Sequence, residues 1–198
     1  MRYFAGFLVL LAIFLFGIVI FGSDPGENSE KPATPISKNT KSLPDYASTD
    51  AIARLTIDGP INGDDMHRQI RISVSSTLRT IDIIQGYQGT VIQTESFINN
   101  QAAYTAFLHA LNKAGYTGKL VKTKKIPFVS DDDQGACPLG NRYYYEIINS
   151  GNNADQRLWT SSCGAPVPGN FGGSAPLVNQ LFQTQFVNYG EFTKTVGI

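Results

Sequence analysis

The residues that could do chemistry are few and scattered along the chain. Asp131, Asp132 and Asp133 precede Gly135, an arrangement shared with the front of a calcium loop, where oxygens at alternating positions surround the ion. The closing glutamate of such a loop would fall at position 142, which holds Arg142. We therefore interpret this run as a solvated acidic turn.

A second group of possible metal ligands consists of Asp58, Asp64, Asp65 and His67. Carboxylates with an imidazole can bind a divalent metal, but such residues often fall together by chance in a polar loop. The other histidine, His109, is expected on the polar side of a helix, exposed to solvent. The sequence predicts no metal site and no cofactor.

Evidence for catalysis is equally thin. No serine stands in a G-x-S-x-G elbow and no phosphate-binding G-x-x-x-x-G-K-[ST] motif occurs. Ordinary acidic residues such as Asp82, Glu95 and Glu146 leave a hydrolase that uses a pair of carboxylates open as an alternative. Sixteen basic and sixteen acidic residues give no net charge, which argues against a nucleic-acid partner.

A short basic segment contains Lys119, Lys122, Lys124 and Lys125. Such a cluster can attract anionic polymers or lipid headgroups. Edge strands also carry lysines as a protection against aggregation. We favour a solvated edge strand or loop here.

Two features indicate binding. Residues 164–173 form a long Gly/Pro-rich loop that presents Val167 and Phe171, and long loops on a rigid scaffold often hold binding residues. Tyr144 is the middle one of three consecutive tyrosines in a predicted strand. Their side chains lie on both faces of the strand, so at least one faces solvent or a partner, and tyrosines are enriched at interfaces. The alternative is that Phe171 folds into the core and the exposed tyrosine packs on its neighbours.

The elements that must position these residues form one α+β domain over residues 51–198. Alternating apolar residues predict short strands joined in antiparallel fashion, and apolar stripes predict two helices packed on one face of the sheet. Asn99 or Asn100 can cap the first helix, which ends at Gly115, and Ser174 can cap a last helix that reaches about Tyr189. The predicted strands are residues 54–57, 70–75, 80–83, 90–96, 142–148 and 156–163.

Cys137 and Cys163 flank the last predicted hairpin. Residues that face each other in an antiparallel pair have a constant sum of positions. For this pair the sum places the turn at Ser150, in the middle of a run rich in turn residues. We therefore predict a disulfide bond, which would stabilise the fold by roughly 3–4 kcal/mol. Such a bond requires an oxidising compartment.

The N-terminus predicts a membrane anchor. Residues 3–22 contain no charge, and a helix of this length spans about 30 Å, the thickness of a bilayer core. A cleaved signal peptide, the alternative, has a shorter apolar region and small residues at its cleavage site, where this chain has Ile20 and Phe21. Arg2 precedes the apolar run, so the N-terminus is expected in the cytoplasm and the rest of the chain outside.

A linker is expected to connect the anchor, residues 1–22, to the domain. Residues 23–50 contain four prolines among polar residues and too few apolar side chains to form a core. We interpret this stretch as a flexible extracytoplasmic spacer.

The order of elements from Gln69 to Tyr189 resembles that of small proteinaceous protease inhibitors of the emfourin kind. The resemblance covers element order and length, and it assigns no site residue because no inhibitory motif is present.

These patterns together predict a single-pass protein of the cell membrane whose extracytoplasmic domain is a non-catalytic binding module. Its expected contacts are the lipid bilayer, through residues 3–22, and a protein or polymer of the cell envelope. Ordinary cysteine usage and the absence of an N-x-[ST] acceptor fit a bacterial envelope protein. The alternatives are an envelope hydrolase that uses carboxylates and a structural part of an envelope assembly.

Overall fold

A computed structural model describes residues 42–126, 128–149, 151–163, 169–194 and 196. The expected anchor, residues 1–22, and the expected linker as far as residue 41 lie outside these ranges. Within the ranges, no helix combines the length and apolar character needed to cross a bilayer.

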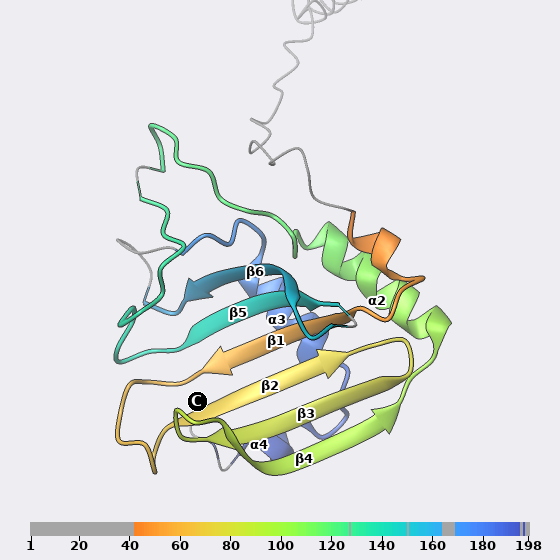
Figure 1. Cartoon of the computed structure of the whole chain (residues 1–198), viewed down its shortest axis with the longest axis horizontal. Coiled ribbons are helices and arrows are strands. Elements are labelled where there is room, and N and C mark those ends of the chain that lie inside the picture. The colour runs from red at the N-terminus through yellow and green to blue at the C-terminus, as the bar shows by residue number, and fades with distance from the viewer. Residues whose placement is uncertain (1–41, 127, 150, 164–168, 195, 197–198) are drawn as a thin grey trace, which may run out of the picture. The chain divides into compact units, whose positions relative to one another are not determined.

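One antiparallel sheet of six strands forms the frame of the domain, as Figure 1 shows. The strand order is β4-β3-β2-β1-β5-β6, so β4 and β6 lie at the two edges. β1 is internal because the chain leaves the sheet after β4 and returns to pair β5 with β1. The strands are β1 Ile52–Asp58, β2 Arg68–Val74, β3 Leu78–Gln85, β4 Thr90–Ile98, β5 Arg142–Ile148 and β6 Ala154–Ser161.

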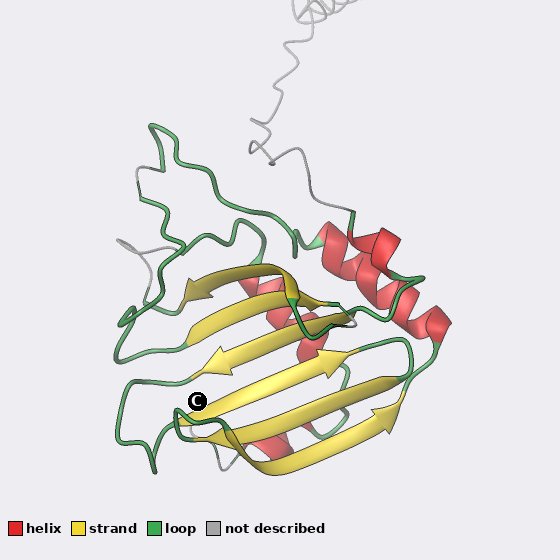
Figure 2. Cartoon of the chain, in the orientation of Figure 1, coloured by secondary structure: helices red, strands yellow, loops and turns green. Residues whose placement is uncertain are grey.

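Within the described ranges, four short helical segments accompany the sheet, and Figure 2 shows α3 and α4 behind it. The side chain of Asn100 accepts a hydrogen bond from the backbone N–H of Ala103 (2.9 Å), which confirms the predicted start of the first helix. Gly115, with φ +78°, follows the last residues of that helix. The segments are η1 Leu43–Tyr46, α2 Gln101–Lys113, α3 Ala175–Gln183 and α4 Tyr189–Thr193.

The core lies between the helices and one face of the sheet. Leu55 of β1, Ile72 of β2 and Ile81 of β3 are adjacent in the register, and all three are fully buried. The residues beside them on the same strands, Thr56, Arg71 and Asp82, are polar and face the other side of the sheet. Leu108 of α2 and Phe182 of α3 complete the cluster. The predicted α+β class, with helices on an antiparallel sheet, is thereby confirmed.

Tyr116 joins two internal strands from within the core. Its hydroxyl accepts hydrogen bonds from the backbone N–H groups of Arg54 in β1 and Glu146 in β5, both at 3.1 Å. The carbonyl oxygens of the same two residues lie 2.7 and 2.8 Å away, so the single proton of this hydroxyl is shared between two acceptors. The side chain is fully buried, and burial raises the pKa of its phenol well above the usual value.

Two boundaries differ from the prediction. The domain begins before residue 51, because Leu43 and Tyr46 of η1 are buried and η1 lies against α2. The helix predicted to follow Ser174 is α3, which ends at Gln183 and not near Tyr189. The Thr184 hydroxyl donates to the carbonyl of Leu181, a side-chain bond that competes with helical pairing.

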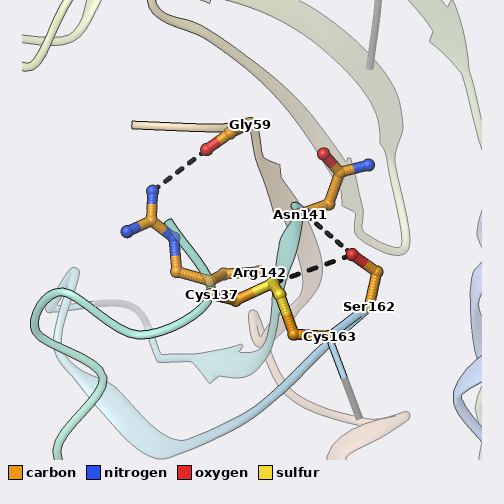
Figure 3. The surroundings of a disulfide bond; sticks show 6 residues. All are labelled: Gly59, Cys137, Asn141, Arg142, Ser162 and Cys163. Atoms are coloured by element: carbon orange, nitrogen blue, oxygen red, sulfur yellow. Dashed lines mark hydrogen bonds between the residues drawn. A yellow bond between two sulfur atoms is a disulfide. The ribbon is translucent and has the colours of Figure 1, made fainter. Parts of the chain in front are cut away.

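The predicted disulfide between Cys137 and Cys163 is confirmed, with Cα atoms 5.5 Å apart (Figure 3). The bond lies at the open end of the β5–β6 hairpin, as predicted, but the register of the two strands differs from the prediction. In the structure, Tyr144 of β5 faces Trp159 of β6. The position numbers of facing residues therefore add up to 303, whereas direct pairing of Cys137 with Cys163 requires 300. Cys137 precedes the strand and reaches its partner through a turn in which Gly140 N–H donates to the Cys137 carbonyl (3.2 Å).

The lysine-rich segment is a loop. In the described chain between α2 and β5, the pairing of strand type is limited to one isolated β-bridge, Lys119↔Phe171. The Lys119 ammonium pairs with the carboxylate of Asp131 at 3.0 Å. Lys122 and Lys125 are exposed. Of the two predicted possibilities, edge strand or loop, the structure has the loop.

Candidate functional site

The two edges of the sheet differ, and this difference defines the candidate site. In β6, the backbone N–H of Trp159 donates to the side-chain oxygen of Asn170 (2.7 Å). The Trp159 carbonyl accepts from the backbone N–H groups of Asn170 (3.1 Å) and Phe171 (3.0 Å). The outward-facing groups at the middle of this edge are therefore already paired. We call residues 169–173 the sealing segment.

The sealing segment is held from its other side as well. Leu120 N–H donates to the Asn170 carbonyl (2.7 Å), and the Asn170 amide donates to the carboxylate of Asp131 (2.7 Å). Gly169 has φ +66°, and a Cβ at this position would collide with the carbonyl of Trp159. A glycine is thus required where the segment approaches the strand.

Phe171, expected at a binding surface, belongs to this segment and is buried. It is 5% exposed, and its ring centroid lies 4.1 Å from that of Tyr145. The structure therefore places Phe171 in the core and not on a surface open to a partner. Val167, expected beside it, lies outside the described residues.

The opposite edge has no such cover among the described residues. β4 reads TVIQTESFI and pairs only with β3. Its apolar side chains are exposed, from 39% at Phe97 to 87% at Ile98. Natural edge strands are protected by lysines, prolines, β-bulges, inward-pointing charges or short length. In β4 the pairing shifts near Val91, outside residues 94–98, and Glu95 lies on the helix face. β4 has nine residues, a single charge at Glu95, and neither lysine nor proline.

The hydrogen bonds of the β3 hairpins show which backbone groups of β4 face outward. Asn99 N–H donates to the Thr77 carbonyl (2.8 Å), so these residues form a hydrogen-bonded pair. Bonded and non-bonded pairs alternate along an antiparallel ladder. The N–H and C=O groups of Thr94, Ser96 and Ile98 therefore point away from β3. We call these three residues the open edge.

The side chains of β4 divide between the two faces of the sheet. Thr94 lies on the polar face, where its hydroxyl donates to Asp82 (2.8 Å). Phe97 lies on the helix face, where its ring contacts that of Phe186 at 5.8 Å between centroids and the Arg79 guanidinium lies 5.7 Å from it. These contacts fix the strand, so its outer edge is preorganised.

Tyr144, the third predicted binding residue, is half-buried on the polar face. The Arg157 guanidinium lies 4.3 Å from its ring centroid. Burial raises the pKa of Tyr144, and the hydrogen bond with Asp133 raises it further. The ring is therefore engaged with neighbours in the same chain.

The acidic run binds cationic and amide groups of the protein. Asp131 pairs with Lys119 and Asn170, and these two hydrogen bonds lower its pKa. Asp133 pairs with Arg157 at 2.6 Å. Burial alone would raise the pKa of Asp133, but the hydrogen bonds with Arg157 and Tyr144 and the charge of Arg157 together outweigh it, so the pKa is lowered.

The carboxylates and histidine of the first turn region are divided between two structural roles. Asp58 is buried between the Arg142 guanidinium (2.6 Å) and His67 Nε2 (2.9 Å). Asp64 accepts from the backbone N–H of Tyr87 (2.8 Å), whose ring stacks on His67. In the part of the chain that the structure describes, no three His, Cys, Asp or Glu side chains are grouped to hold a metal ion.

The carboxylates considered for hydrolysis lie apart. Asp82 and Glu95 face opposite sides of the sheet, because their cross-strand neighbours differ by one position. Glu146 lies on β5, separated from β3 by β2 and β1, and its carboxylate is 3.6 Å from Arg157 Nε. His109 is exposed, as expected. The structure does not bring these groups into one constellation.

Sequence reasoning missed the open edge. It predicted a strand at residues 90–96, but the strand's place at an edge depends on the remote pairing of β1 with β5. The available signal was the run of apolar and neutral residues with a single charge.

Comparison with models of known protein families and with curated protein sequences finds no match to this chain.

Proposed function

We propose that this protein is a membrane-anchored extracytoplasmic binding module that captures its partner as an added strand on the open edge. The observation that carries the proposal is the contrast between β6, where the sealing segment pairs the backbone groups of Trp159, and an apolar β4 whose outer edge no described residue covers. An exposed edge strand binds an extended segment through main-chain hydrogen bonds. Such binding needs no catalytic residue.

The proposed location is supported by two independent features. The apolar run at residues 3–22 has the length and composition of a bilayer-spanning helix. The disulfide between Cys137 and Cys163 uses both cysteines of the chain, and disulfides persist in oxidising compartments. We propose that the N-terminus is cytoplasmic and the domain lies outside.

The apolar character of the open edge favours binding over a passive role. Ile98 is 87% exposed and lies directly opposite Leu78, which is 43% exposed. Removing apolar surface from water is favourable, so two neighbouring exposed aliphatic side chains gain this stabilisation only when another surface covers them. A partner strand would cover both.

A matched pair of lysine substitutions tests the proposal. Ile98→Lys places a charge on the open edge, while Leu139→Lys makes a similar change in a loop at almost the same exposure, 87% against 88%. The full-length chain, reconstituted in nanodiscs, is incubated with solubilised envelope proteins of the source cell, and bound proteins are quantified by mass spectrometry.

We expect proteins bound by the wild type to be lost with Ile98→Lys and retained with Leu139→Lys. Equal capture by all three chains would overturn the proposal. The location is tested separately by treating intact cells with a thiol-reactive, membrane-impermeant label. The domain should react only after a reductant has opened the disulfide.

A further inference from the structure

We infer that the strand added to the open edge is β4 of a second copy of this chain. Two copies would pair β4 against β4, antiparallel, about a two-fold axis at Ser96. The inference rests on the proposed function and specifies its partner. It also gives β4 a defined register, which can be measured.

The outward-facing backbone groups are arranged symmetrically about Ser96. They belong to Thr94, Ser96 and Ile98, and a two-fold axis in an antiparallel pair sets one residue opposite itself. With the axis at Ser96, Thr94 of each copy lies opposite Ile98 of the other. Every outward N–H and C=O group of this stretch then meets a partner, and three bonded pairs supply about six hydrogen bonds.

The charges of β4 distinguish this register from its neighbour. An axis at Glu95 would set two carboxylates directly opposite each other, an unfavourable arrangement. An axis at Ser96 sets Glu95 opposite Phe97, so no like charges face. The pairing of β4 with β3 shifts near Val91, which faces Ile84 of β3. The register centred on Ser96 leaves this irregular part of β4 outside the central contact.

The side chains of the open edge also suit a copy of themselves. Ile98 and Leu78 form the exposed aliphatic corner at one end of the stretch. In the paired arrangement, the Thr94 methyl group of the other copy lies beside Ile98 and reduces its exposure. The same contact occurs twice, once at each end, because the two-fold axis repeats it.

The helix that follows β4, α2, leads away from the open edge (Figure 1). After β4 the chain turns into α2, which runs from the end of β4 toward the β6 side of the sheet, as Figure 1 shows. The proposed anchor would hold copies in one plane and raise their effective concentration, so a modest contact area is sufficient.

Site-directed cross-linking tests this register. Ser96→Cys is introduced into the full-length chain with its native disulfide intact, and membranes are oxidised under mild conditions. Opposite residues in a bonded pair have Cα atoms about 5.5 Å apart, within the range that a disulfide bridges. The matched control is Thr90→Cys, also exposed on β4, whose copies would lie about 40 Å apart in this register.

We expect a cross-linked dimer with Ser96→Cys in several-fold higher yield than with Thr90→Cys. Adding Ile98→Lys to Ser96→Cys should remove the dimer, whereas adding Leu139→Lys should not. Equal yields for the two cysteine variants would indicate random collision and overturn the inference. The mass of the wild-type assembly, measured in nanodiscs large enough for two copies, tests dimer formation independently.

The outcomes separate the two proposals. A monomeric wild type without the Ser96→Cys dimer overturns pairing with a second copy. If Ile98→Lys then still loses envelope proteins that Leu139→Lys retains, the open edge binds a different partner and the proposed function stands. If neither effect is observed, both proposals fail.

Discussion

Removing the disulfide should destabilise the domain by an amount that follows from the length of the loop it closes. The perturbation is the double change Cys137→Ser and Cys163→Ser. The two residues are separated by 26 positions. In the chain-entropy description, a loop of that length makes the unfolded state less favourable by about 3.5 kcal/mol at 25 °C.

The surroundings of the bond indicate that the native geometry survives its removal. Arg142 Nη2 donates to the Gly59 carbonyl (3.1 Å) without any contact to the sulfurs, and Asn141 N–H donates to the Ser162 hydroxyl (2.9 Å), which also lies 3.8 Å from Cys137 Sγ (Figure 3). The effect should therefore come from the unfolded state and leave the folded sheet in place.

Urea unfolding of the full-length chain in a mild detergent measures the effect. The chain has one tryptophan, and Trp159 is fully buried beside the sealing segment, so its fluorescence reports the folded domain. With a slope of about 2 kcal/mol per molar urea, the midpoint should fall by roughly 2 M. Reduced wild-type protein should behave like the double variant.

Two results would refute this reasoning. A loss of less than about 1 kcal/mol would mean that the unfolded chain is already compact without the bond. An altered emission spectrum of Trp159 before any urea is added would mean that the native packing, and not the unfolded chain, had changed.

Three further predictions concern single side chains. Tyr116→Phe removes the hydroxyl that bridges β1 and β5 and should lower the free energy of unfolding by about 1–3 kcal/mol, measured by the same titration; no change would mean that the strands pair fully without it. Gly169→Ala forces the sealing segment away from Trp159, so hydrogen exchange at the Trp159 amide should accelerate; unchanged protection would show that the segment does not hold this edge. Because its folded-state pKa is lowered, Asp133 adds stability above its unfolded-state pKa near 3.8, and this is lost as pH falls through the folded-state value. Asp133→Asn should therefore destabilise the domain at pH 7 and have little effect near pH 2, and equal losses at both pH values would exclude the ion pair as the cause.

Local patterns predicted most of the elements because their residues carry the information themselves. Ile70, Ile72 and Val74 alternate with polar residues, and the strand that contains them is buried on one face. Asn100 and Gly115 have side-chain and backbone properties that suit the two ends of α2. Such signals depend only on neighbours in the sequence.

The roles of individual candidate residues depended on remote contacts and could not be predicted in the same way. Phe171 is buried because its ring packs against Tyr145 and its backbone N–H donates to the Trp159 carbonyl. Tyr144 is occupied because Arg157 and Asp133 come from other parts of the chain. A Gly/Pro-rich loop has the same composition whether it meets a partner or the edge of its own sheet.

The sealing segment sets a limit on how far the sheet of this protein can grow. A chain with two free edges could add copies at both and extend into a fibre of the cross-β kind. Here Asn170 and Phe171 already form hydrogen bonds with the backbone N–H and C=O of Trp159 in β6, the other edge strand. A dimer joined through β4 therefore offers a third copy no free backbone groups at this position. In the proposed dimer the segment thus ends the sheet, and its displacement would allow further copies to add at β6.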